Sequence, residues 1–232
     1  MLFRQLVDPE SSGFTYLVAA RSGGEALLID PVLGQVELYL RLLEAFDLRL
    51  VFVADTHGHE VESSALCELG ERTGCVTLMG EQTRVECVTR KLRDGETITI
   101  DSIALQAVYT PGHTADSYSF VAYDRVFTGD TLLIRGTGRT DLDTGDARQQ
   151  YQSLRKLLKL PGSTLVYPGH DYHGRCVSTI EEEKAHNPRL RARSADEYER
   201  LMDSMRPPHP KLMDLPARPH VSWADLDMLK SS

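Results

Sequence analysis

The chain has 232 residues, of which 41% are hydrophobic, and its formal net charge at pH 7 is −8. This hydrophobic fraction allows a sizeable core and argues against intrinsic disorder. A surface that binds duplex nucleic acid needs a net basic patch, whereas this chain is acidic and its lysines and arginines are scattered along it. The composition therefore argues against a nucleic-acid-binding protein.

Compartment and redox state are also suggested by the sequence. No apolar run reaches the roughly 18 residues expected of a membrane span, and the first segment, MLFRQLVDPESS, resembles neither a signal peptide nor a transit peptide. We therefore expect a cytoplasmic protein with no membrane partner. No CxxC motif is present, so we expect free thiols in a reducing compartment. The four cysteines are Cys67, Cys75, Cys87 and Cys176.

The first part of the chain predicts a hairpin followed by a strand–helix–strand unit. A glycine turn at residues 21–24 separates the two hairpin strands. The expected elements are strands at 14–20 and 25–29, a helix at 36–46, a strand at 48–54, a helix at 64–72 and a strand at 75–79.

The second part predicts a run of short strands and then helices. The expected elements are strands at 96–100, 103–109, 118–122 and 126–127, a helix at 146–160, a strand at 164–167 and mostly helices after Ser178. A Pro-rich stretch at 207–219 predicts an irregular tail. We therefore expect an α/β protein with a single domain over 1–232, including a helical and Pro-rich extension over about 178–232.

Polar residues cluster where predicted strands end. His57-Gly-His59, Pro111-Gly-His113, Gly129-Asp130 and Pro168-Gly-His170 each follow an apolar run. Strand ends of an α/β sheet share one edge, so these segments are expected to converge on one crevice. Two imidazoles with one carboxylate are the ligand set of non-haem Fe(II) oxygenases. The pattern therefore predicts a transition-metal site.

These motifs resemble those of the metallo-β-lactamase fold, an αββα four-layer sandwich with its metal site at one edge of two sheets. The resemblance rests on Thr56-His-Gly-His59, Thr110-Pro-Gly-His-Thr114, Phe127-Thr-Gly-Asp130 and Tyr167-Pro-Gly-His170. Residues 128–141, TGDTLLIRGTGRTD, together with His170-Asp-Tyr-His-Gly174 and Asn187-Pro188, are similar to the persulfide (sulfur) dioxygenases, which are relatives of glyoxalase II. The segment 134–141 is the most diagnostic part of this resemblance.

The resemblance implies one Fe(II) per chain, held by His57, His113 and Asp130, which would be the catalytic residues. The implied substrates are glutathione persulfide and O2, and the products are sulfite and glutathione. Iron would supply the redox chemistry while the protein fixes the geometry. A homodimer is left open.

Other residues are implied to support this centre. His59, His170 and Asp171 would lie beside the ligands and orient them, although Asp171 is also suited to anchoring its loop. Arg139, Tyr172 and Arg175 would bind the anionic substrate, since a guanidinium suits carboxylates.

Further predictions concern one arginine and three histidines. Arg135 is a weaker substrate candidate, and an ordinary salt bridge is the alternative for each arginine. His186, His209 and His220 are expected at the surface.

The sequence departs from the family at the metal motif. The usual His-x-His-x-Asp-His reads His57-Gly-His-Glu-Val61-Glu62 here. Binuclear relatives use the replaced pair to hold a second metal, so Val61 argues against a two-metal hydrolase. Glu60 and Glu62 are expected in a solvated acidic loop, with metal binding as the alternative. Two alternatives stay open: a glyoxalase II-like thiolester hydrolase acting on S-acylglutathione, and a catalytically degenerate protein that binds glutathione or a persulfide.

Overall fold

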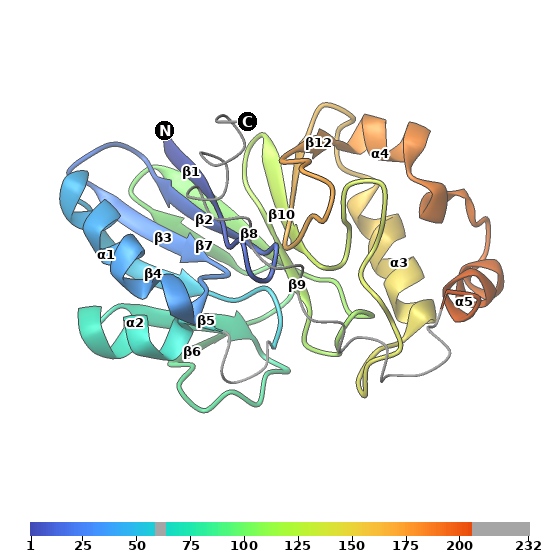
Figure 1. The fold of residues 1–232 in the computed structure, drawn as a ribbon, viewed down its shortest axis with the longest axis horizontal. Helices are drawn as coiled ribbons and strands as arrows, with labels where there is room; N and C mark the ends of the chain where they lie inside the picture. The colour runs from blue at the N-terminus through green and yellow to red at the C-terminus, as the bar shows by residue number, and fades with distance from the viewer. Residues whose placement is uncertain (59–63, 206–232) are drawn as a thin grey trace, which may run out of the picture.

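The computed structural model describes residues 1–58 and 64–205, and it builds them into two facing β-sheets with helices outside (Figure 1). The first sheet has the strand order β1-β2-β3-β4-β5-β6, and the second has the order β12-β11-β10-β9-β8-β7. The strands of the two sheets are β1 (Leu2–Val7), β2 (Phe14–Ala19), β3 (Glu25–Ile29), β4 (Arg49–Ala54), β5 (Val76–Gly80), β6 (Arg90–Leu92), β7 (Thr97–Ile100), β8 (Ile103–Tyr109), β9 (Tyr118–Val121), β10 (Arg125–Gly129), β11 (Leu165–Pro168) and β12 (Ser178–Thr179).

Helices cover the outer face of each sheet. They are α1 (Val36–Ala45), α2 (Leu66–Thr73), α3 (Ala147–Leu157), α4 (Ile180–His186) and α5 (Ala195–Asp203), with short 3₁₀ turns η1 (Leu33–Gln35) and η2 (Pro188–Arg191). In α1, Val36, Tyr39 and Leu43 are buried, which is the spacing of one helical face. The side chain of Asp146 caps α3 by accepting from the Gln149 N–H. The predicted helix over 146–160 therefore begins one residue later than the sequence suggested.

The core is divided between three hydrophobic clusters that match the layers. The cluster between the sheets contains Tyr16, Phe120 and Phe127. A second cluster joins α1 and α2 to the first sheet, and a third joins α3 and α5 to the second sheet. This arrangement confirms the expected αββα sandwich, because each sheet buries one face against the other sheet and one face under helices.

Parallel pairing brings the polar strand ends to one edge. β3, β4 and β5 are parallel neighbours in the first sheet, and β10 and β11 are parallel neighbours in the second. The Tyr16 hydroxyl donates to the Pro168 carbonyl across the two sheets at 2.5 Å. The Phe14 N–H donates to the Gly169 carbonyl at 2.8 Å. These contacts hold the two sheet edges together.

The sequence-based prediction missed β1, β6 and β12. β1 is an edge strand with only partly buried side chains, so its alternation of apolar and polar residues is weak. β6 and β12 have three and two residues, which is too short for a periodic pattern to show. Their pairing is decided by neighbouring strands rather than by their own sequences.

The prediction of free thiols was wrong for two of the four cysteines. Cys67 and Cys87 form a disulfide with a Cα–Cα distance of 5.5 Å. Cys75 is a buried free thiol, and Cys176 is an exposed one. The two bonded cysteines are 20 residues apart in the chain, and only the packing of α2 beside the segment after β5 brings them together.

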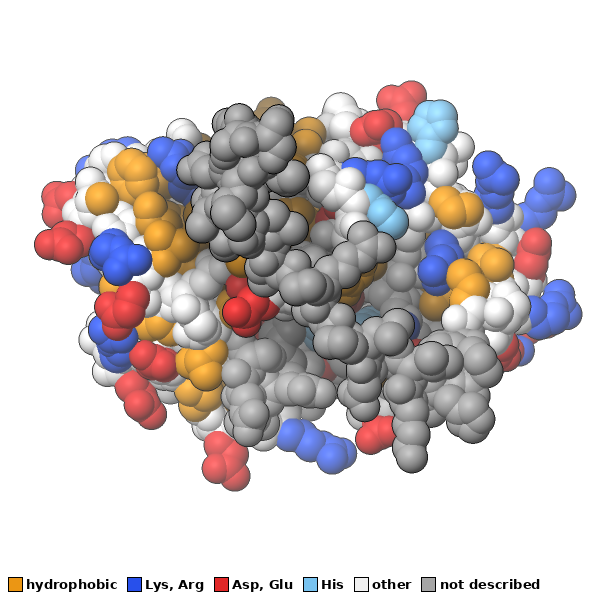
Figure 2. Space-filling view, in the orientation of Figure 1, with side chains coloured by type: hydrophobic (Ala, Val, Ile, Leu, Met, Phe, Trp, Pro, Cys, Tyr) orange, Lys and Arg blue, Asp and Glu red, His pale blue; other side chains and the backbone are white. Residues whose placement is uncertain are grey.

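On the face in Figure 2, acidic and basic side chains are interspersed over the two helical flanks. No helix within 1–58 and 64–205 is long and apolar enough to cross a membrane. The expected single domain with an extension from about 178 stays a prediction, and its Pro-rich part at 207–219 lies outside the described residues.

Candidate metal centre

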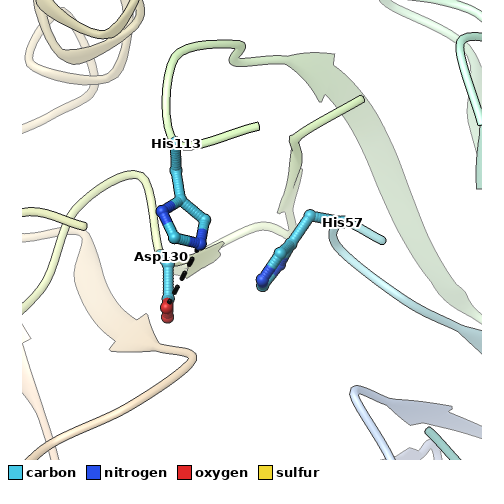
Figure 3. Close-up of side chains that lie close together, drawn as sticks. All are labelled: His57, His113 and Asp130. Atoms are coloured by element: carbon cyan, nitrogen blue, oxygen red, sulfur yellow. Dashed lines mark ion pairs between the residues drawn. The ribbon is translucent and has the colours of Figure 1, made fainter. Parts of the chain in front are cut away.

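Three side chains from three separate segments meet at the shared sheet edge (Figure 3). His57 follows β4, His113 follows β8 and Asp130 follows β10. One potential ligand atom from each lies within 4.8 Å of the other two, and His57 and His113 are buried. The sequence reasoning found all three, because each stands directly after an apolar strand in a glycine-containing turn.

The ring of His113 is oriented by the backbone. Its Nδ1 lies 2.9 Å from the Arg139 carbonyl oxygen. A carbonyl can only accept, so Nδ1 carries the proton and Nε2 presents its lone pair. That Nε2 lies 3.6 Å from Asp130 Oδ2, which points the free electron pair toward the carboxylate and the centre.

The ring of His57 is oriented in a similar way, through a hydroxyl. Its Nδ1 lies 2.9 Å from Thr56 Oγ1, and that hydroxyl donates its proton to Asp30 Oδ2 at 3.0 Å. The Thr56 oxygen must therefore accept from His57 Nδ1, which leaves Nε2 of His57 as the ligand atom. Asp30 also accepts from the Thr56 N–H at 2.7 Å. The Asp30–Thr56 pair thus fixes the tautomer of His57.

Asp130 is held by His170, the fourth strand-end side chain. His170 Nδ1 lies 2.8 Å from Asp130 Oδ1, which leaves Oδ2 on the side of His113. Burial raises the pKa of Asp130, but the hydrogen bond from His170 and the electrostatic attraction of His170, His57 and His113 outweigh it and hold that pKa well below its usual range. The carboxylate is therefore ionised and available as a ligand.

The segment 134–141 forms a wall beside this centre. The Gly138 N–H donates to the Asp130 carbonyl at 2.7 Å. A Cβ at Gly138 would overlap that carbonyl oxygen and would lie 2.9 Å from His113 Nδ1. Only glycine allows the wall to approach both ligands this closely. The most diagnostic segment of the sequence is thus the one that positions two of the three proposed ligands.

A cavity of about 330 Å³ opens onto His113 and Asp130, a size suited to a small-molecule ligand. The lining residues beyond these two are Leu133, Thr137, Gly138, Arg139, Thr140, Asp141, Tyr172, Arg189, Met202 and Met205. The cavity therefore joins the metal centre to η2 and α5, which lie late in the chain.

The predicted substrate residues differ in their relation to this cavity. Arg139 and Tyr172 line it, and the Arg139 guanidinium is paired with the Asp141 carboxylate at 2.6 and 2.8 Å. Tyr172 is 68% exposed and its ring stacks near His170. Arg175 is not among the lining residues, and its Nη1 donates to the Ile134 carbonyl at 3.3 Å.

Arg135 points away from the cavity, into a structural ion pair. Its Nη1 lies 2.6 Å from Glu183, whose side chain is fully buried. The Glu183 carboxylate also accepts from Ser178 and from Asn187. Arg135 therefore forms an ordinary salt bridge, which was the alternative to its role in substrate binding.

Arg189 is a lining residue that the sequence reasoning missed. It lies in η2, is half-buried, and has no ion pair with any carboxylate in the described part of the chain. Its Nη1 lies 3.1 Å from the Met202 sulfur. The only sequence signal was its position directly after Asn187-Pro188, which belongs to the family resemblance.

The remaining predicted positions can be placed in part. The Asp171 carboxylate accepts from the backbone N–H groups of His173 and Arg175, so it anchors its own loop. His186 is exposed, as expected. The other predictions of this kind lie outside the described residues, namely those for His59, Glu60, Val61, Glu62, His209 and His220.

Comparisons with known proteins agree with this geometry. Residues 77–170 match the family model of the Metallo-beta-lactamase superfamily. The chain is 39% identical over 219 residues to "Persulfide dioxygenase ETHE1, mitochondrial" from Homo sapiens, covering 92% of this chain and 85% of that protein. It is 32% identical over 212 residues to a "Hydroxyacylglutathione hydrolase" from Rhodospirillum rubrum, covering 90% and 81%.

A solved structure is similar over nearly the whole chain. The crystal structure of ETHE1 from Myxococcus xanthus superimposes with a TM-score of 0.86 at 46% identity, covering 93% of this chain and 96% of that one. The similarity therefore includes both sheets and the strand ends that carry the three clustered side chains.

Proposed function

Because this chain belongs to the persulfide dioxygenase family of the metallo-beta-lactamase superfamily, we propose that it oxidises glutathione persulfide with O2 to sulfite and glutathione. One persulfide, one O2 and one water give one thiol, one sulfite and two protons. The observation that carries this proposal is the cluster of His57, His113 and Asp130, of which the last two line a cavity.

The donor set fits a single Fe(II). Two imidazole nitrogens and one carboxylate oxygen are the protein ligands of non-haem Fe(II) oxygenases. Each ligand has a partner that sets its orientation: Thr56 for His57, the Arg139 carbonyl for His113, and His170 for Asp130. Such partners are typical of metal sites and raise the affinity of the ligands for the ion. When bound, Fe(II) would supply the redox chemistry that links the persulfide sulfur to O2.

The cavity suits an anionic peptide thiol in an acidic protein. Arg139 and Arg189 bring two guanidinium groups to its wall, and Asp141 neutralises the first of them. Arg189, without such an ion pair in the described residues, is the stronger partner for a substrate carboxylate. The apolar side chains of Leu133 and Met202 line the rest of the wall and would shield the reacting sulfur from bulk water. A contribution of Arg175 stays a prediction from the resemblance.

Removal of a ligand tests the proposal. We expect Asp130→Asn and His113→Ala to lose bound iron and O2 uptake together, whereas His186→Ala, at an exposed position, keeps both. The assay combines metal analysis with an oxygen electrode after anaerobic loading with Fe(II), and it compares O2 consumed with sulfite formed. Persulfide turnover by protein free of metal would contradict the assignment.

A thiolester hydrolase is the second candidate, supported by the similarity to the hydroxyacylglutathione hydrolase. The same metal analysis separates the two, because two metal ions per chain with cleavage of S-acylglutathione would favour hydrolysis. Binding of glutathione without any turnover would favour the degenerate binding protein. We propose the dioxygenase because Val61 stands where binuclear relatives have an aspartate that binds the second metal, so a second ion would lack that ligand.

A further inference from the structure

The disulfide Cys67–Cys87 lines a second cavity, separate from the one that opens onto Asp130. Cys67 lies in the first turn of α2, and Cys87 lies in the segment between β5 and β6. Both residues are partly exposed, and both line a groove of about 760 Å³. A small thiol can therefore reach the bond from solvent.

Part of the wall of this groove comes from the loops that carry two of the proposed metal ligands. Gly58 follows His57, and Thr114 follows His113, and both line the groove. Asp116 joins these loops, since its Oδ1 accepts from the Gly58 N–H at 3.3 Å and from the Thr114 hydroxyl at 2.7 Å. One pair of loops thus carries two of the proposed ligands and also borders the groove of the disulfide.

The size of the hydrophobic core does not call for this bond. The chain has four cysteines in 232 residues and three hydrophobic clusters, whereas structural disulfides are concentrated in small secreted domains with little core. Isolated disulfides in other settings are commonly transient and take part in exchange. The partial exposure of both cysteines favours exchange over a buried staple.

We propose that Cys67–Cys87 is a thiol-exchange site. A small thiolate attacks one Sγ, the S–S bond breaks, and its electron pair leaves on the other Sγ, which takes up a proton. A second thiolate then attacks the outer sulfur of the mixed disulfide, releasing the small disulfide and the second protein thiol. Two electrons pass from the two small thiols to the protein.

The charged side chains that line the groove determine which small thiols approach the disulfide. Arg84 is the cationic side chain among the lining residues, against the carboxylates of Glu71, Glu86 and Asp116. An excess of negative charge slows the approach of anionic molecules. The groove therefore selects neutral or cationic thiols over glutathione, which is an anion.

Breaking the bond also affects the metal centre through α2. The Ser64 hydroxyl accepts from the Leu66 N–H at 3.0 Å and donates to Asp55 Oδ2 at 2.6 Å. Asp55 lies two residues before His57. Because the disulfide ties this turn of α2 to the segment after β5, its reduction loosens the support of His57. This second step rests on the proposed metal role of His57 and is independent of persulfide oxidation.

The exchange is tested on the full chain, loaded anaerobically with Fe(II). Cysteamine and glutathione are added in separate arms at equal concentration, and the reduced and mixed-disulfide forms are counted by mass spectrometry after alkylation. We expect cysteamine to open the bond roughly 10-fold faster at low salt, with the difference narrowing at high salt. A Cys176→Ser variant removes the exposed free thiol, so that the buried Cys75 is the one free thiol left beside the disulfide.

The coupling is tested by the rate at which a chelator removes iron. We expect the reduced protein and the Cys67→Ser/Cys87→Ser variant to lose iron roughly 10-fold faster than the oxidised protein. A bond that resists cysteamine, or equal rates with both thiols, would overturn the exchange site and its selectivity. Equal iron loss from the oxidised and reduced forms would overturn the coupling. Failure to bind iron at all would instead refute the metal assignment, and exchange would still be measured by mass.

Discussion

His170 donates its Nδ1 proton to Oδ1 of Asp130 at 2.8 Å, while Oδ2 of the same carboxylate lies 3.6 Å from His113 Nε2. The two oxygens of Asp130 thus differ in their contacts: Oδ1 is hydrogen-bonded to His170, and Oδ2 faces the proposed ion. This division explains why a fourth strand-end side chain, His170, accompanies a three-ligand centre.

Replacement of His170 should weaken metal binding without removing a ligand. We expect His170→Ala to lower the affinity for Fe(II) roughly 10- to 100-fold, since loss of such an orienting partner has effects of this size. The measurement is a competitive Fe(II) titration under anaerobic conditions. His173→Ala, in the same loop but exposed, serves as the control, and an unchanged affinity in His170→Ala would show that Asp130 is held by other contacts.

A methyl group on the wall segment should disturb the centre directly. Gly138→Ala places Cβ against the Asp130 carbonyl and 2.9 Å from His113 Nδ1, so we expect loss of iron binding and of O2 uptake. Gly136→Ala is the matched control, because its Cβ would meet only Leu133 at an ordinary 3.8 Å. Circular dichroism confirms that both variants fold. Normal iron content in folded Gly138→Ala would contradict the positioning role of this wall.

Arg189 should govern affinity for the substrate. We expect Arg189→Ala to raise KM for glutathione persulfide about 10- to 100-fold, the usual range for a lost hydrogen-bonded charge pair, with a smaller change in kcat. Arg191→Ala, an exposed arginine in the same 3₁₀ turn, should leave KM unchanged. Arg175→Ala tests the role implied by the family resemblance. A KM increase in Arg175→Ala but not in Arg189→Ala would show that the loop of Arg175, and not η2, binds the substrate carboxylate.

Tyr198 should make stability fall at alkaline pH. Burial raises the pKa of Tyr198 from 10.0 to about 12, and its hydroxyl donates to Gln150 Oε1 at 2.9 Å. Because the folded pKa lies above the unfolded one, this stability is complete below pH 10 and is lost as the pH rises to 12, about 3 kcal/mol in all.

The measurement is the free energy of unfolding in urea at several pH values between 8 and 11.5. We expect Tyr198→Phe to be less stable than the natural chain at pH 8 and to lose less stability as the pH rises. Tyr123→Phe, at a fully exposed position, should follow the natural chain. If the unfolding free energies of Tyr198→Phe and of the natural chain fall in parallel as the pH rises, the pH dependence does not come from Tyr198.

The sequence by itself determined the fold and the clustered side chains. His57, His113, Asp130 and His170 each end an apolar strand, and strand ends of neighbouring strands meet because the backbone pairing is regular. The positions of these side chains could therefore be predicted from short motifs, namely the glycines beside them and the spacing of the apolar residues before them.

The tertiary structure alone decided which charged groups and which cysteines meet. Arg135 pairs with Glu183, which is 48 residues away, and Arg189 reaches the cavity because η2 packs beside the strand ends. Cys67 and Cys87 are joined only when α2 lies against the segment after β5. An ion pair, a cavity wall or a disulfide depends on distances between segments far apart in the chain, and no local pattern of residues encodes those distances.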